Sequence, residues 1–125
     1  SAAWFRLMRG SQRPDEALTC LSRISRNHAA DPRAATAEFT RGRILLFQLH
    51  RPEEAAQAFA AVRTLSPGSS LAQDALAREV EALYQAGDAD RLRLRAEEYA
   101  AKYPRGRRID AVRRMGGLEP AGTNR

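Results

Sequence analysis

Prolines recur along this chain at the interval of one helix pair, and no other feature constrains the fold as strongly. The segment Arg13-Pro14-Asp15-Glu16-Ala17 returns 38 residues later as Arg51-Pro52-Glu53-Glu54-Ala55. A second set, Pro32, Pro67 and Pro104, is spaced by 35 and 37 residues. Two independent markers with nearly the same period predict a repeat protein, in which each unit buries its apolar face against its neighbours.

Between the prolines, apolar residues follow the three- and four-residue spacing of one buried helix face. This spacing predicts helices over 33–49, 52–65, 71–86 and 88–103, followed by a short helix over 108–115. The connectors are two to five residues long, so consecutive helices are expected to pack antiparallel. Residues typical of N-caps stand at Asp31-Pro32, Ser70 with Gln73, and Asp88. The candidates for a left-handed helix end are Gly87, Gly106 and Gly116.

The composition of the chain argues against several classes of protein. With 43% apolar and 29% charged residues, a chain of 125 residues forms one modest core, and its apolar runs fall far short of the ~20 residues that cross a bilayer. The single Cys20 allows no internal disulfide and no cysteine-rich zinc site. The spacing of His28 and His50 suits neither a metal pair nor a motif with Cys20. We therefore expect no enzyme activity, no metal and no cofactor.

The net charge of +6 is concentrated at the two ends of the chain. Residues 1–35 carry 6 basic and 3 acidic residues, 36–87 carry 5 and 6, and 88–125 carry 10 and 6. The C-terminal excess includes a basic patch made of Arg105, Arg107, Arg108, Arg113 and Arg114. Such a patch either binds the phosphates of nucleic acid or the carboxylates of an acidic partner, or is an ordinary solvated surface.

Helix pairs at this period, each closed by a proline, resemble the tetratricopeptide repeat. The resemblance covers residues 1–104, and the second unit has one extra residue in the turn around His50. The residues that carry it are Ala17, Leu21, Ile24, Gly42, Ala55, Phe59, Pro67, Gly87, Leu92, Ala96, Tyr99 and Pro104. The closing Tyr103-Pro104-Arg105-Gly106 is similar to repeat ends in bacterial cell-envelope and periplasmic members of this family and in the C-terminal repeat tails of FecR-like regulators.

The resemblance implies an all-α fold with about two and a half tetratricopeptide-like antiparallel helix pairs in a short right-handed superhelix. The expected domain is 1–116, with units over 1–32, 33–69 and 70–106, a capping helix at 108–115 and a disordered tail at 117–125. Because the first unit has only half of its first helix, we expect the chain to continue N-terminally within a larger bacterial protein. Trp4, Leu7 and Met8 at that edge could pair two copies.

In this family the first helix of each unit lines a groove for a protein or peptide. The matching positions give a partner-binding groove of Thr36, Phe39, Arg43, Phe47, Asp74, Ala77, Glu81 and Tyr84. The alternative for both phenylalanines is core packing, which is slightly favoured for Phe47, and Tyr84 presents its hydroxyl to a ligand or to a turn carbonyl. The resemblance thus predicts a noncatalytic protein-binding or scaffolding module, with nucleic-acid or acidic-partner binding through the basic patch as the alternative.

Overall fold

A computed structural model describes residues 14–27 and 32–120. Within these ranges the chain is entirely helical, with six α-helices and one π-helical segment and no strand, which confirms the predicted all-α class. The elements are α2 (Pro14–Asn27), α3 (Pro32–Arg43), η1 (Ile44–Gln48), α4 (Pro52–Leu65), α5 (Ser70–Ala86), α6 (Ala89–Lys102) and α7 (Ile109–Gly116). The predicted helix boundaries from 52 onward agree with these to within one residue.

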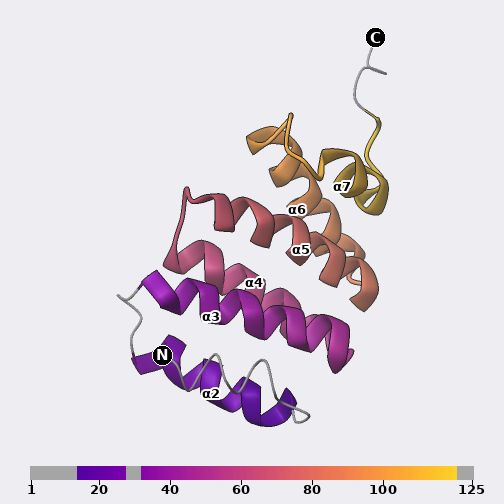
Figure 1. Ribbon diagram of the computed structural model, residues 1–125. Coiled ribbons are helices and arrows are strands. Elements are labelled where there is room, and N and C mark those ends of the chain that lie inside the picture. The colour runs from indigo at the N-terminus through magenta and orange to yellow at the C-terminus, as the bar shows by residue number, and fades with distance from the viewer. Residues whose placement is uncertain (1–13, 28–31, 121–125) are drawn as a thin grey trace.

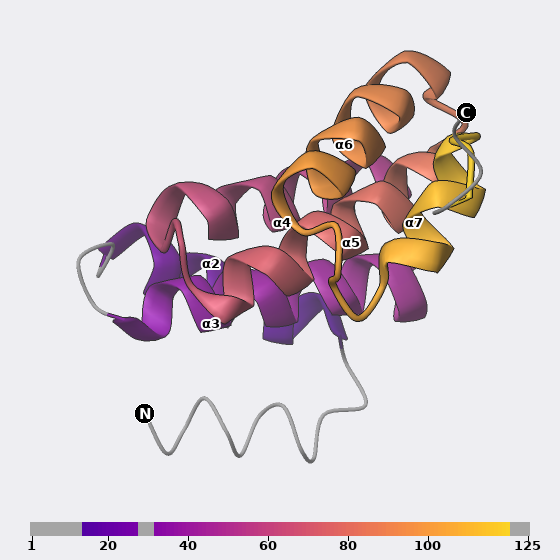
Figure 2. The ribbon, with the colours of Figure 1, turned by 90° about the horizontal axis from the view of Figure 1, so that it is seen from above.

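The helices are stacked in chain order, and each packs mainly against its neighbours in the sequence. Figure 1 shows consecutive helices running side by side in alternating directions, from α2 at one end to α6 and α7 at the other. From above, α6 and α7 lie at the end of the stack, with α7 against both α5 and α6 (Figure 2). None of the helices in the described ranges has the length and hydropathy required to span a bilayer.

The helix ends differ from the prediction at three positions. Ser69, not Ser70, caps α5, because its side chain accepts a hydrogen bond from the N–H of Ala72 at 3.1 Å. Asp88 caps α6 and Gly87 closes α5 in the left-handed conformation, both as predicted.

At the end of α7 the left-handed residue is Gly117, while Gly116 is the last helical residue. Gly106 has no positive φ. Both glycines are instead places of close approach: a Cβ on Gly116 would meet that of Ala96, and one on Gly106 would meet the Tyr99 hydroxyl. The residue after Gly117, Leu118, is hydrogen-bonded to the carbonyl of Arg113 and packs on the core, so neither Gly117 nor Leu118 belongs to the disordered tail expected from 117 onward.

The core of the central helices is built around the fully buried ring of Phe59 on α4. The position opposite is Gly42 on α3, where an added Cβ would lie 2.7 Å from the Phe59 ring. Such an approach leaves room for no side chain, so the small residue predicted there is what lets α3 and α4 pack closely.

A π-helical turn separates α3 from the connector to α4. The N–H of Leu49 bonds to the carbonyl of Ile44, five residues earlier, so the turn contains one residue more than an α-helical turn. Directly after it, His50 takes a left-handed φ of 55°. The chain between α3 and α4 therefore contains a π-helical turn and a left-handed residue.

Several predicted features lie outside the described residues. They are the first-unit helix before Pro14, the edge residues Trp4, Leu7 and Met8, the cap at Asp31, His28, and residues 121–125.

Candidate functional site

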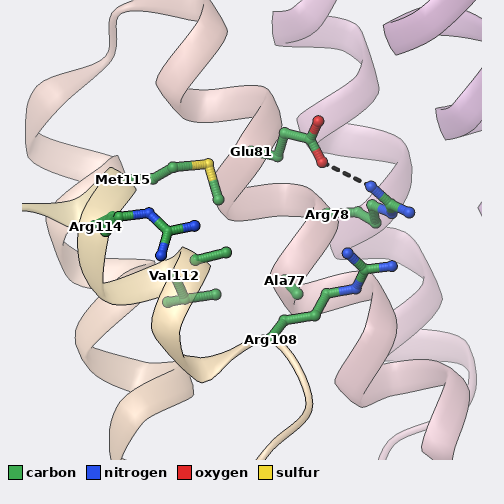
Figure 3. Close-up of a pocket in the computed structure, with 8 residues that line it drawn as sticks. Ala77, Arg78, Glu81, Arg108, Val112, Arg114 and Met115 are labelled. Carbon is green, nitrogen blue, oxygen red and sulfur yellow. Dashed lines mark hydrogen bonds and ion pairs between the residues drawn. The ribbon is translucent and has the colours of Figure 1, made fainter. Parts of the chain in front are cut away.

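The predicted groove positions of α5 share one face of that helix. Asp74, Ala77, Glu81 and Tyr84 follow each other at intervals of three or four residues. Ala77 and Glu81 form one wall of a hollow of about 300 Å³ between α5 and α7, with Arg78 beside them. Figure 3 shows this hollow, and we call it the α5–α7 hollow.

The opposite wall of the α5–α7 hollow comes from the start and body of α7. It consists of Arg108, Ala111, Val112, Arg114 and Met115. Arg108 and Arg114 belong to the predicted basic patch, so the fold joins at one place two features that the sequence presented separately. Arg107 of the basic patch also pairs with Asp74 of the predicted groove, with 3.6 Å between Nη2 and Oδ1.

The charges around the α5–α7 hollow are unequal. Arg78 and Glu81 form an ion pair between Nη1 and Oε1 at 2.8 Å, and both side chains are about three-quarters buried. Neither Arg108 nor Arg114 has a carboxylate within 4.0 Å in the part of the chain that the structure describes. The lining therefore contains three guanidinium groups and one carboxylate, which gives the hollow an excess of positive charge.

A buried tyrosine fixes the place where α7 begins. Tyr99 on α6 is 1% exposed, and its hydroxyl accepts hydrogen bonds from the backbone N–H of Arg108 at 3.3 Å and from Nε2 of Gln73 at 3.5 Å. Sequence reasoning named Tyr99 only among the residues that carry the resemblance, and it missed the role of the hydroxyl. A buried hydroxyl requires a partner, but nothing in the residue pattern indicates which backbone group supplies it.

The two phenylalanines of the predicted groove go to different places. Phe39 packs edge-on against Phe59 with ring centroids 5.4 Å apart, so it joins the core cluster. Phe47 is 43% exposed, and the guanidinium of Arg78 lies 5.5 Å from its ring centroid. The slight preference for Phe47 as a core residue is wrong, because the π-helical turn directs it away from the core. Arg43 and Thr36 are exposed on α3, away from any lining of the hollow.

Tyr84 lies one turn beyond Glu81 and is 56% exposed. Its hydroxyl has no hydrogen-bond partner within the described ranges, so the turn carbonyl considered as an alternative does not hold it. The ring extends the groove face past the end of the α5–α7 hollow.

The rest of the basic patch is dispersed. Arg105 and Arg107 are exposed in the connector before α7, and Arg113 donates from Nη1 to the carbonyl of Glu119 at 3.0 Å. Of the five arginines, Arg108 and Arg114 are the two that line the hollow.

An ion-pair network that sequence reasoning missed ties α4, α5 and α6 together. Arg63 binds Glu79 at 2.8 Å and Glu98 at 3.2 Å, and Arg95 binds the same two carboxylates at 3.4 and 2.8 Å. Lys102 adds a contact to Glu98 at 2.9 Å. Glu98 thus connects α4 with α6 through Arg63.

The two carboxyls of the network differ in their pKa. Burial raises the pKa of Glu79 above its ordinary value of 4.5, since the neighbouring Arg63 and Arg95 offset only part of the desolvation. Partial burial also raises the pKa of Glu98, but hydrogen bonds from Lys102 and Arg95 and the charge of Arg63 outweigh it and lower that pKa below 4.5. Neither carboxyl lines the hollow, and the network instead links α4, α5 and α6.

Metal-binding groupings are not found within the ranges described. No three His, Cys, Asp or Glu side chains converge on a common metal position there. Cys20 is half-buried on α2 against the cluster of Ala17 and Leu21. Searches with protein-family models, curated proteins and solved structures give no significant match to this chain.

Proposed function

We propose that this chain is a noncatalytic protein-binding module of the tetratricopeptide type, which holds a peptide segment of its partner along the face of α5. The observation that carries the proposal is the α5–α7 hollow, where two groove positions expected from the resemblance, Ala77 and Glu81, line a concave surface. Helical repeat arrays bind partners through such concave surfaces.

The lining of the hollow supports binding rather than catalysis. Ala111, Val112 and Met115 offer apolar surface, and methionine adapts to ligand side chains of different shapes. Around them stand a few charged groups, which is the combination by which pockets orient a ligand. The lining contains no histidine, cysteine, serine or threonine that would act as a nucleophile or base.

Selection of peptides tests the proposal directly. The purified chain is immobilised and challenged with a phage-displayed library of random peptides, and the affinity of each enriched peptide is measured by fluorescence anisotropy. Ala111→Phe fills the hollow, whereas Ala101→Phe makes the same change at an exposed position of α6. We expect Ala111→Phe to weaken binding at least about tenfold and Ala101→Phe to change it less than about twofold.

Two results would contradict the proposal. One is a selection that enriches no peptide for the wild-type chain. The other is equal binding by wild type and Ala111→Phe, with both shown to be folded by circular dichroism, because the peptide would then sit elsewhere.

A further inference from the structure

The α5–α7 hollow has a charge pattern that points to the chemistry of its ligand. We infer that it binds an acidic peptide segment, with a ligand carboxylate held between Arg108 and Arg114 and an adjacent apolar ligand side chain against Met115. This inference rests on the proposed function and specifies the partner of the same site.

The first support is the state of the two arginines. Both line the hollow, and neither is neutralised by a carboxylate of the described chain. Figure 3 shows their side chains reaching the hollow from the two ends of α7. A guanidinium that lines the hollow without a carboxylate partner in the described chain keeps its planar set of donors for a carboxylate of the ligand.

The second support is that the one acid of the hollow is already occupied. Glu81 would repel a ligand carboxylate if its charge were free. It is bonded to Arg78 at 2.8 Å, and Arg78 is held in turn over the ring of Phe47. This pairing leaves the charge of Arg108 and Arg114 available, and it keeps Arg78 from competing for the ligand.

The third support distinguishes a peptide from a nucleic acid. Single-stranded nucleic acids are held by aromatic side chains on which bases stack, together with a basic groove along the backbone. The hollow has no aromatic residue in its lining, and its floor is aliphatic, formed by Ala77, Val112 and Met115. Guanidinium groups beside an aliphatic floor suit a carboxylate next to an apolar side chain, as found in acidic peptides.

The test uses the peptides enriched in the selection described above. We expect them to share Asp or Glu next to an apolar residue. Replacing that acid by its amide in the peptide, or Arg108→Gln or Arg114→Gln in the protein, should each weaken binding about tenfold. Arg114→Lys keeps the positive charge but loses the planar guanidinium group. Its affinity for the peptide should therefore lie between those of the wild type and Arg114→Gln. Arg93→Gln removes an equal charge from the exposed surface of α6 and should change binding less than about twofold.

The outcomes separate this inference from the proposed function. Peptides that bind the hollow equally well with acid or amide would overturn the inference and leave the proposed function standing. Equal losses for Arg93→Gln and Arg114→Gln would also overturn it, since the attraction would then be a property of overall charge. A labelled oligothymidylate that binds more tightly than every peptide, and that loses binding with Arg108→Gln, would replace the peptide by a nucleic acid. A selection without any enriched peptide would refute both.

Discussion

The hydroxyl of Tyr99 and the backbone N–H of Arg108 are joined by a hydrogen bond of 3.3 Å that connects the core of α6 to the first turn of α7. Tyr99 is fully buried, whereas the side chain of Arg108 lines the α5–α7 hollow. The position of a surface charge is therefore fixed by a group in the interior.

Removing that hydroxyl should loosen α7 and the site together. Tyr99→Phe leaves the N–H of Arg108 without its acceptor, and we expect the free energy of unfolding to fall by roughly 1–3 kcal/mol. Urea denaturation measures the loss, and hydrogen exchange should show faster exchange at the amide of Arg108. Tyr103→Phe is the matched control, because the Tyr103 hydroxyl has no partner within the described ranges. Equal losses in both variants would contradict the assigned role.

Because α3 and α4 approach closely at Gly42, we expect a larger residue at this position to destabilise the fold. In Gly42→Ala the new methyl group would lie 2.7 Å from the Phe59 ring, which is fully buried and cannot move aside freely. We expect a loss of roughly 1–3 kcal/mol in the free energy of unfolding, measured by urea denaturation. Phe59→Leu in the same chain should recover part of it, because the two changes are coupled. Strict additivity of the two losses would show that the contact is not the cause.

The separation of the two groove phenylalanines predicts unequal costs of truncation. Phe39→Ala removes a ring that packs on Phe59 and should cost roughly 2–4 kcal/mol. Phe47→Ala removes an exposed ring that holds Arg78, and it should cost no more than about 1 kcal/mol. Thermal and urea denaturation compare the two variants. A larger loss for Phe47→Ala would restore the core assignment that the sequence favoured.

The two carboxyls of the ion-pair network should affect the free energy of unfolding in opposite ways as the pH changes. The effect of Glu98 changes below pH 4.5, and the effect of Glu79 changes above it. The pKa of Glu98 is lowered on folding, so its contribution is present above 4.5 and is lost as the pH falls through the lower folded value. The pKa of Glu79 is raised, so its contribution is present below 4.5 and is lost as the pH rises through the higher folded value. Relative to Glu79→Gln, the wild type should therefore gain stability as the pH falls from 7 towards 4.5.

Urea denaturation of both proteins at a series of pH values measures this difference. Glu98→Gln tests the other carboxyl. The stability of the wild type relative to Glu98→Gln should decrease only when the pH falls below 4.5. A difference between wild type and Glu79→Gln that stays constant from pH 7 to 4.5 would contradict the raised pKa of Glu79.

The sequence predicted the helices well because their signals are local. Apolar spacing and prolines defined α4 to α7, and Asp88 and Gly87 act as expected at their helix ends. Gly42 is also among the residues that carry the resemblance, and the approach of the Phe59 ring explains why glycine is needed there.

The site could be predicted only in part, because its assembly depends on contacts between distant segments. Spacing on a helix placed Ala77 and Glu81 on one face, but no pattern indicated that Arg108 and Arg114 would form the opposite wall. The network between Arg63 and Glu79 likewise joins residues 16 positions apart on different helices. Phe47 was misjudged for a different reason. The face that a residue occupies depends on the local winding of the helix, and the expectation assumed regular winding.

The number of residues in the π-helical turn at Ile44–Gln48 determines where the exposed ring of Phe47 lies on the surface. Each residue of a helix advances the side chains after it by about 100° around the axis, so a widened turn resets the angular phase of every position that follows. Deleting one residue between Ile44 and Phe47 would rotate the ring of Phe47 away from Arg78 while both of these side chains are kept. An aromatic support for a charged side chain would thus be gained or lost through an insertion or deletion alone, without any substitution.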